Sequence, residues 1–256
     1  MKESRNETLL IELGCEELPP RSLENLAQAF FDGVCERLEN AGIEYDSEGS
    51  RPLFSPRRLA MQIAGVAGHQ PDREIERRGP ALKAAFDEQG QPTAAARGFA
   101  GSVGVAVDEL ETLRTEKGEW LFCRIRERGK DLEDLLFPML QQALDGLPVA
   151  KPMRWSDHDF SFVRPVHWLV VLHGQRILRG GLYGHDAGRD TRGHRVHHPE
   201  PIRLDHADDY LDALEQGRVL ADPTARRERI RDAVTNAGEA AGGRARVTHE
   251  LLAEVN

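Results

Sequence analysis

Thr8-Leu9-Leu10-Ile11-Glu12-Leu13 opens the part of the sequence that decides the fold, and Pro19-Pro20 follows it. The apolar run predicts a strand that ends at Gly14. Proline fits the first turn of a helix, because that turn leaves its N–H groups unbonded, so Pro19-Pro20 predicts a helix start. Apolar residues then recur at three- and four-residue spacing, at Leu23, Leu26, Ala27, Phe30, Val34, Leu38 and Ala41. This spacing predicts a helix with one core-facing stripe that stops at Gly42.

Further strands and helices are predicted along the rest of the chain. Strand-like spacing covers residues 59–66, 119–125, 167–172 and 176–182, and the last two are joined at a glycine turn. Helical spacing covers 131–144, the shorter stretches 81–86 and 93–99, and the tail from Asp208. Strict strand–helix alternation is missing, so we expect an α+β fold with mixed or antiparallel sheets and flanking helices. The expected segments are an α/β segment at 1–70, a central α+β domain at 71–205 and a helical segment at 206–256.

The composition is that of an acidic globular protein. The chain has 256 residues, of which 39% are hydrophobic and 30% charged, and its net charge is −9. An acidic balance disfavours nonspecific coating of a nucleic acid but leaves room for a local basic groove. No window approaches about 18 uninterrupted apolar residues, so no membrane span is predicted. An odd number of cysteines without a CxxC pair indicates reduced thiols and a cytoplasmic protein: Cys15, Cys35 and Cys123.

Arginine and histidine residues recur at proline- and glycine-rich turns, where they are candidate ligands of a polyanion. Guanidinium groups on rigid turns hold phosphate in a fixed geometry, because each offers a planar fork of donors. The candidates for binding RNA are Arg57, Arg58, Arg154, Arg164, His167, Arg192, His194 and Arg195. Arg57-Arg58 also fit a salt-bridged turn, and Trp168 fits either a base-stacking residue or a core residue. The arginines of 73–78 alternate with glutamates, which favours an exposed, charge-balanced segment.

Histidines concentrate in a loop-like stretch, residues 180–199. They are numerous enough for a metal site, but their spacing fixes no known zinc geometry, and neighbouring arginines oppose a dication: His185, His194, His197 and His198. A solvated loop and a phosphate- or RNA-binding loop are the other interpretations. The sequence has no GxxxxGK[ST] motif, no GxGxxG motif after a strand and no GxSxG motif, so no nucleotide-binding or acyl-transfer centre is predicted. We expect Glu16-Glu17 to stabilise the start of the following helix through its dipole.

A series of motifs carries a resemblance to a known family. They are Glu16-Glu17-Leu18-Pro19-Pro20, Pro56-Arg57-Arg58-Leu59-Ala60, Pro71-Asp72-Arg73-Glu74-Ile75-Glu76-Arg77-Arg78-Gly79-Pro80, Lys117-Gly118-Glu119-Trp120, Met153-Arg154-Trp155, Phe162-Val163-Arg164-Pro165-Val166-His167 and Arg192-Gly193-His194-Arg195. One alone is weak, but together and in order they are specific. The chain resembles the N-terminal part of the β subunit of the bacterial heterotetrameric glycyl-tRNA synthetase. Ser156 stands where the family pattern has glycine. Family β subunits are far longer, so we expect a fragment of a longer chain.

The resemblance implies a subunit of an α2β2 enzyme that joins glycine to tRNA(Gly). In that family the α subunit uses ATP and Mg to activate glycine, and the β subunit binds tRNA. The N-terminal region of β is similar to the tRNA-facing, editing-type domain of the phenylalanyl-tRNA synthetase β subunit. The resemblance therefore implies neither a catalytic centre nor a cofactor or metal in this chain, and no membrane partner. Two alternatives stay open: a structural module between subunits or domains, and an editing domain that hydrolyses mischarged tRNA.

Overall fold

The computed structural model describes residues 6–116 and 118–256. The chain forms two compact units, a first unit of Met1–Gln70 with Asp131–Asn256 and a second unit of Pro71–Lys130. This division differs from the three segments expected from the sequence. Residues 131–205 belong with the N-terminal segment, because strand β7 (Val166–His173) pairs with strand β1 (Glu7–Cys15) in one sheet.

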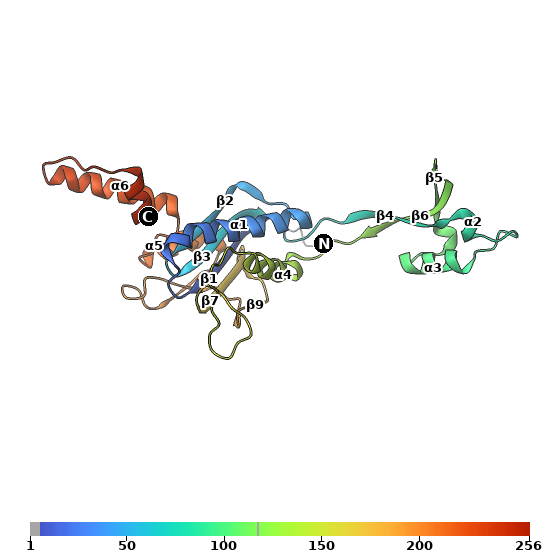
Figure 1. Ribbon diagram of the computed structural model, residues 1–256, viewed down its shortest axis with the longest axis horizontal. Coiled ribbons are helices and arrows are strands. Elements are labelled where there is room, and N and C mark those ends of the chain that lie inside the picture. The colour runs from blue at the N-terminus through green and yellow to red at the C-terminus, as the bar shows by residue number, and fades with distance from the viewer. Residues whose placement is uncertain (1–5, 117) are drawn as a thin grey trace. The chain divides into compact units, whose positions relative to one another are not determined.

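A five-stranded antiparallel sheet forms the centre of the first unit (Figure 1). Its strand order is β2–β3–β1–β7–β8, where β2 covers Asp46–Ser55, β3 covers Arg58–Val66 and β8 covers Arg176–Ile177. Strand β1 lies in the middle and is buried from residue 9 to residue 15. Its continuous apolar run is therefore explained by a strand that is covered on both faces.

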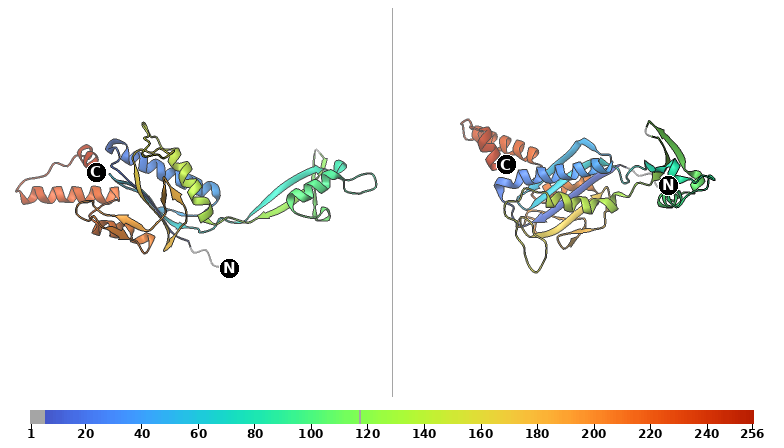
Figure 2. Two further views of the ribbon diagram at one scale, coloured as in Figure 1. Left: turned by 90° about the horizontal axis from the view of Figure 1, so that it is seen from below. Right: turned by 45° about the vertical axis from the view of Figure 1, so that its right-hand side comes forward.

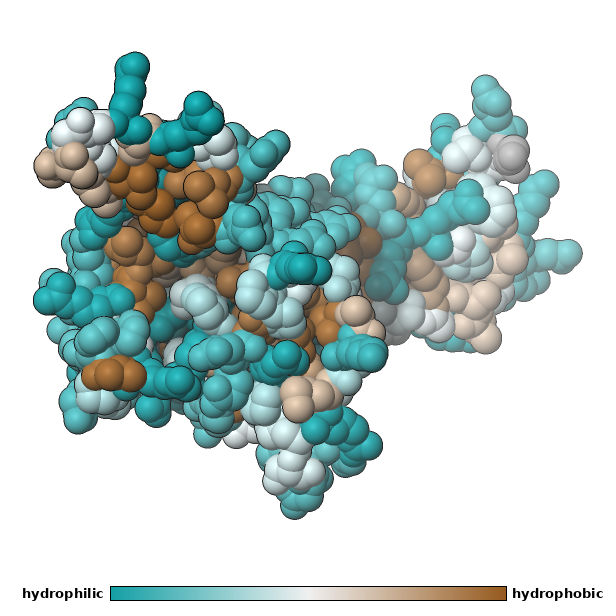
Figure 3. Space-filling model, turned by 60° about the vertical axis from the view of Figure 1, so that its left-hand side comes forward, coloured by the Kyte–Doolittle hydropathy of each residue, from teal (hydrophilic) through white to brown (hydrophobic). Residues whose placement is uncertain are grey.

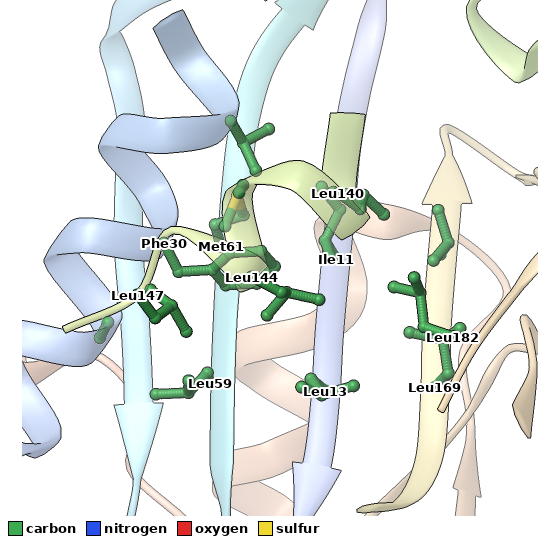
Figure 4. Close-up of a cluster of buried hydrophobic side chains, with 14 of the residues drawn as sticks. Ile11, Leu13, Phe30, Leu59, Met61, Leu140, Leu144, Leu147, Leu169 and Leu182 are labelled. Atoms are coloured by element: carbon green, nitrogen blue, oxygen red, sulfur yellow. The ribbon is translucent and has the colours of Figure 1, made fainter. Parts of the chain in front are cut away.

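The two faces of the sheet take alternate side chains of each strand. Helices α1 (Pro20–Ala41) and α4 (Leu132–Asp145) cover one face (Figure 2). Side chains from both helices and from β1, β3 and β7 fill the layer between them (Figure 4). On the opposite face, a smaller core forms beneath helix α5 (Tyr210–Gln216). Leu9, Ile11, Leu13 and Cys15 of β1 join the larger core, and Leu10 joins the smaller one.

Helix α1 begins and ends where the sequence predicts. Pro20 lies in its first turn, and its buried residues form one stripe: Leu23, Leu26, Ala27, Phe30, Val34, Cys35 and Leu38. Gly42 follows the helix with a φ of 71°, in the left-handed region, and donates its N–H to the carbonyl oxygen of Glu39 at 2.8 Å. A glycine is suited to this position because a Cβ disfavours the left-handed conformation.

We expect Gly42→Ala to lower the free energy of unfolding by about 1 kcal/mol, because alanine is strained in the left-handed region. Gly188→Ala is the matched control in the same unit. Gly188 has no positive φ, and an added Cβ would meet only the carbonyl oxygen of Leu169, at 3.8 Å. Urea denaturation followed by circular dichroism measures both. Equal losses for the two variants would contradict this account of the helix end.

The second unit is a three-stranded antiparallel sheet with a small core. Its order is β4–β6–β5, with β4 at Arg73–Ala81, β6 at Gly118–Glu127 and β5 at Glu111–Thr115. Helices α2 (Leu82–Ala85) and α3 (Ala94–Val103) and the 3-10 helix η1 (Val107–Glu109) complete it. The buried residues of this core are two alanines and one leucine: Ala85, Ala96 and Leu121.

Strand β4 contains the alternating arginines and glutamates of residues 73–78. Most of these side chains are exposed, as expected, and the segment is a strand paired with β6. Glu76 forms an ion pair across this pair of strands with Arg124, at 3.3 Å. The guanidinium of Arg78 lies 4.6 Å from the centre of the Trp120 ring. Lys117, part of one family-like motif, lies outside the described residues.

Short strands and C-terminal helices complete the first unit. The stretch 180–199, expected to be loop-like, contains strands β9 (Gly181–Leu182), β10 (His185–Asp186) and β11 (Asp190–Arg192). The remaining elements are β12 (Pro201–Arg203), the 3-10 helix η2 (Ala207–Asp209), α6 (Pro223–Ala240) and α7 (His249–Val255). Apolar residues gather on the face that carries α6 and α7 (Figure 3), where Val234, Leu251 and Val255 are exposed. Across residues 6–116 and 118–256, no helix has the length and apolar character needed to cross a membrane.

Candidate functional site

A basic cleft lies where three turns of the first unit meet. Its volume is about 280 Å³, and it is lined by Glu16, Arg57, His167, Trp168, Arg192, Gly193, Arg195, His198 and Pro199. Four of the residues predicted to bind RNA line it: Arg57, His167, Arg192 and Arg195. They come from the β2–β3 turn, the start of β7, the end of β11 and the turn after β11. The fold thus brings together cationic side chains that are far apart in the sequence.

Backbone hydrogen bonds fix the walls of the cleft. Pro56 and Arg57 form the turn between β2 and β3. The segment after β1 is bonded to this turn, because Cys15 N–H donates to the Arg57 carbonyl at 2.9 Å and Leu18 N–H donates to the Pro56 carbonyl at 2.7 Å. Glu16 N–H donates to the carbonyl of Pro165, just before β7, at 2.9 Å. The three turns therefore hold one another in place.

Glu16 is the carboxylate inside the cleft. Its Oε1 lies 2.9 Å from His167 Nε2 and 3.5 Å from Arg57 Nη2. Glu17 lies at the rim, 3.9 Å from Arg195 Nη2. Stabilisation of the start of α1 by Glu16-Glu17 stays a prediction: both residues precede the first turn of the helix, and their carboxylates pair with Arg57 and Arg195.

Arg58 is a correction to the predicted set, because it faces the protein interior. Its side chain is 2% exposed and pairs with Glu12, which is 0% exposed, at 2.9 Å. Further donors of Arg58 reach Ser55 Oγ at 2.9 Å and the carbonyl oxygen of Arg192 at 2.6 Å. Burial by itself would lower the pKa of the guanidinium, but Glu12, Tyr210 and Cys15 together outweigh burial, and the pKa is raised. Arg58 thus supports the cleft from beneath as a permanently charged group.

Trp168 separates Arg58 from the cleft. It is 7% exposed and belongs to the smaller core, which supports the interpretation of this residue as a core tryptophan. The guanidinium carbon of Arg192 lies 5.6 Å from its ring centre and that of Arg58 lies 5.8 Å away. Both distances are within the range of cation–π attraction. The indole therefore orients Arg192 at the wall of the cleft.

Two buried donors of the cleft have no hydrogen-bond partner among the residues that the structure describes. They are Nε of Arg57 and Nε1 of Trp168. An unpaired buried donor costs on the order of 1–3 kcal/mol, because it has lost water without gaining an acceptor. Among the side chains that line the cleft, Glu16 is the acidic one, beside the cationic Arg57, Arg192 and Arg195.

The loop after β11 is held by close glycine packing. A Cβ on Gly193 would lie 2.6 Å from the carbonyl oxygen of Gly217, and His194 N–H donates to that oxygen at 2.7 Å. His194 Nδ1 accepts from the N–H groups of Val196 and His197, both at 3.2 Å. His194 thus serves the turn with one ring nitrogen. It lines a neighbouring cavity and is absent from the lining of the cleft itself.

The histidines of this region are not gathered around one point. His185 Nε2 lies 2.9 Å from the carbonyl oxygen of Val166, and His198 Nδ1 lies 3.2 Å from that of Glu200. The rings of His194 and His197 contact each other in a tilted arrangement, with their centres 4.5 Å apart. Within residues 6–116 and 118–256, no group of three or more histidine, cysteine or acidic side chains is placed to hold a metal ion.

Arg154 and Arg164 lie away from the cleft, contrary to the predicted grouping. Arg154 is exposed and bonds to Asp159 at 3.1 Å and to the carbonyl oxygen of His158 at 3.0 Å. Arg164 Nη1 donates to the carbonyl of its neighbour Val163 at 2.8 Å. Neither residue lines the cleft.

Glu16 and Pro199 were not predicted as parts of this site, and His198 was predicted only as a member of the histidine-rich loop at 180–199. Glu16 was recognised only as a helix-start residue, since its pairing with Arg57 and His167 depends on strand order. A usable signal was the position of Glu16 directly after a strand that ends in a turn, where candidate site residues are common. His198 and Pro199 enter the cleft only because the loop folds back on Gly217.

Thiol chemistry does not arise next to the cleft. Cys15 is fully buried at the end of β1, and burial raises the pKa of its thiol to about 12. The pKa of Cys35 is raised to about 11, again by burial. All three cysteines are free and buried. Since the thiolate is the reactive form, Cys15 stays a neutral core residue near neutral pH.

Guanidinium and imidazole donors on rigid turns are typical of proteins that hold phosphate-bearing ligands. The particular family follows from sequence comparison: residues 9–256 match the family described as glycyl-tRNA synthetase beta subunit. The chain belongs to this family and matches the N-terminal part of its members.

Individual relatives agree with this assignment. The glycine–tRNA ligase beta subunit of Chromohalobacter salexigens is 50% identical over 248 residues, which cover 97% of this chain and 36% of the relative. That of Marinobacter nauticus is 44% identical over 248 residues, covering 96% and 36%. That of Xylella fastidiosa (strain Temecula1) is 44% identical over 247 residues, covering 96% and 34%. The chain therefore spans about a third of the length of these relatives.

Proposed function

We propose that this chain contributes tRNA binding and subunit assembly to the ATP-dependent attachment of glycine to tRNA(Gly). Adenylation of glycine, with its ATP and Mg, takes place on a separate α subunit in an α2β2 complex in the cytoplasm. We also propose that the fold is similar to the editing-type domain of the phenylalanyl-tRNA synthetase β subunit. Support comes from the family and from the names of the relatives, which are beta subunits of glycine–tRNA ligase.

One observation carries the RNA-binding part of the proposal: Arg57, His167, Arg192 and Arg195 converge on a single cleft. Only Glu16 and, at the rim, Glu17 oppose them there. On a chain of net charge −9, a local excess of guanidinium groups favours specific binding of a polyanion over general coating. Since the family is that of a tRNA ligase subunit, we take the polyanion to be the phosphates of tRNA.

We expect paired Arg192→Ala and Arg195→Ala to weaken tRNA binding about tenfold, the equivalent of about 1.4 kcal/mol. The slope of log affinity against log salt should flatten by about one unit, or slightly less, for each lost phosphate contact. Both substitutions remove exposed side chains, so the double variant should keep the fold. Titration of the 256-residue chain with tRNA(Gly) at several salt concentrations, by fluorescence anisotropy, measures both quantities.

The matched control is paired Arg176→Ala and Arg203→Ala. These arginines belong to the same unit and are also exposed, and each lies near one carboxylate, Glu133 at 3.8 Å and Asp205 at 3.9 Å. They are absent from the lining of the cleft. Equal weakening by the two pairs would indicate nonspecific attraction and contradict the proposal. Unchanged tRNA binding together with weaker binding of the α subunit would favour the structural-module alternative.

A further inference from the structure

The basic cleft opens beside a larger cavity with a different lining. This cavity has a volume of about 660 Å³ and shares Arg57, Trp168, Gly193 and Arg195 with the cleft. Its other walls combine apolar side chains, such as Leu23, Phe54 and Val219, with charged ones, such as Glu24 and Arg226. Pockets of about 300–1,000 Å³ with apolar walls and a few fixed polar groups are typical of small-ligand sites. A donor-rich compartment and a larger, partly apolar compartment therefore adjoin at the same four residues.

The donor-rich compartment is incompletely satisfied by the protein itself. Glu16 Oε1 is shared between His167 at 2.9 Å and Arg57 at 3.5 Å. Arg57 Nε and Trp168 Nε1 are buried and have no acceptor within residues 6–116 and 118–256. A phosphate group has more acceptor oxygens than a single shared carboxylate oxygen. It would therefore pair with the cationic side chains of Arg57, His167 and Arg192 more completely than Glu16 does.

From this pair of compartments we infer a subsite for a single nucleotide of a bound RNA, with its phosphate in the cleft and its base against the apolar walls of the larger cavity. The Glu16 carboxylate stands in for the phosphate in the free protein and is displaced when the nucleotide enters. This inference rests on the proposed function and gives the cleft a ligand of defined size and chemistry. A base has a flat apolar face that packs on apolar walls, whereas a free phosphate gains nothing from them.

The first test compares three probes on the 256-residue chain by isothermal titration calorimetry: adenosine 5′-monophosphate, ribose 5-phosphate and inorganic phosphate. We expect the mononucleotide to bind about tenfold more tightly than ribose 5-phosphate, because only the mononucleotide carries a base that can pack on the apolar walls of the larger cavity. We also expect it to compete with tRNA. Equal affinities for the mononucleotide and ribose 5-phosphate would overturn the assignment of the larger cavity to the base. Binding without competition would overturn the assignment to a bound RNA.

The second test is Glu16→Gln, which removes the resident charge but keeps the shape of the side chain. We expect tighter binding of inorganic phosphate and of the mononucleotide, by about two- to fivefold, the range of an exposed ion pair. Glu215→Gln is the matched control, since Glu215 pairs with Arg229 at 2.6 Å outside the cleft. Unchanged or weaker phosphate binding by Glu16→Gln, with an unchanged circular dichroism spectrum, would overturn the role of Glu16.

The two levels of the proposal fail separately. If tRNA binds and depends on Arg192 and Arg195 while the mononucleotide does not bind, the nucleotide subsite is wrong and the proposed function stands. If the mononucleotide binds and tRNA does not, the proposed tRNA binding fails, and so does the assignment of the subsite to a bound RNA.

Discussion

Arg58→Ala is expected to lower the free energy of unfolding by about 3–5 kcal/mol, the cost of leaving one charge of a buried ion pair without its partner. Glu12 is 0% exposed and has Arg58 as its ion-pair partner at 2.9 Å. Removal of the guanidinium also takes a donor from Ser55 and from the carbonyl oxygen of Arg192. The stability of the core and the position of the cleft wall thus depend on the same side chain.

Urea denaturation measures this loss, and Arg154→Ala is its control. Arg154 was an equal candidate in the sequence, but its ion pair with Asp159 is exposed, so we expect a loss below about 1 kcal/mol. The double variant Arg58→Met with Glu12→Leu removes both charges. It should recover much of the stability lost in Arg58→Ala, because apolar residues of similar size can replace a buried pair. A loss of under 1 kcal/mol for Arg58→Ala would show that the pair is not buried.

The contrast between Arg57 and Arg58 illustrates what the sequence alone is unable to decide. The two residues are adjacent and chemically identical, and both follow Pro56. Register separates them, since Arg58 is already paired with Ser55 and Gly14 in the sheet while Arg57 lies in the turn. Neighbouring side chains at such a point take opposite directions. The motif therefore predicts a basic turn but not which arginine is available to a ligand.

Elements with a strong local pattern were predicted well. Strand β1, helix α1 and helix α4 carry long apolar runs or stripes, and their bounds agree with the prediction within a few residues. Strand β2 was missed because its first seven residues, 46–52, are mostly polar and exposed. The division into units was also missed, since the pairing of β1 with β7 joins residues about 150 positions apart. Such pairing leaves no periodic trace in either strand.

The convergence of site residues depends on that same long-range pairing. The motifs at 57, at 167 and at 192–195 were recognised as basic, and the sheet then placed them around one cleft. Arg154 and Arg164 had equally good motifs but lie in the segment leading to β7, where local partners take up their donors. Motif chemistry therefore selects candidates, and strand order decides which of them meet.

Gly14→Val is expected to lower the free energy of unfolding by about 3 kcal/mol, the upper end of the usual cost of overpacking a core. Gly14 lies opposite Trp168 in the pairing of β1 with β7, and a Cβ on Gly14 would overlap the indole ring. The indole cannot move freely, because it packs in the smaller core and carries Arg192 on its ring. The substitution should therefore also weaken tRNA binding by displacing Arg192.

A double-mutant cycle tests this physical cause of the Gly14→Val effect. Trp168→Ala alone is expected to cost about 3–5 kcal/mol, as a large buried aromatic side chain is lost. Once the indole is absent, the valine has room, so the double variant should be no less stable than Trp168→Ala. Additive losses would mean that Gly14 is needed for its backbone conformation, and not because a side chain there would collide with the indole. Because Gly14 has no side chain, the Trp168 indole can pack directly on the central strand, and Arg192 at the wall of the cleft is in turn positioned by that indole.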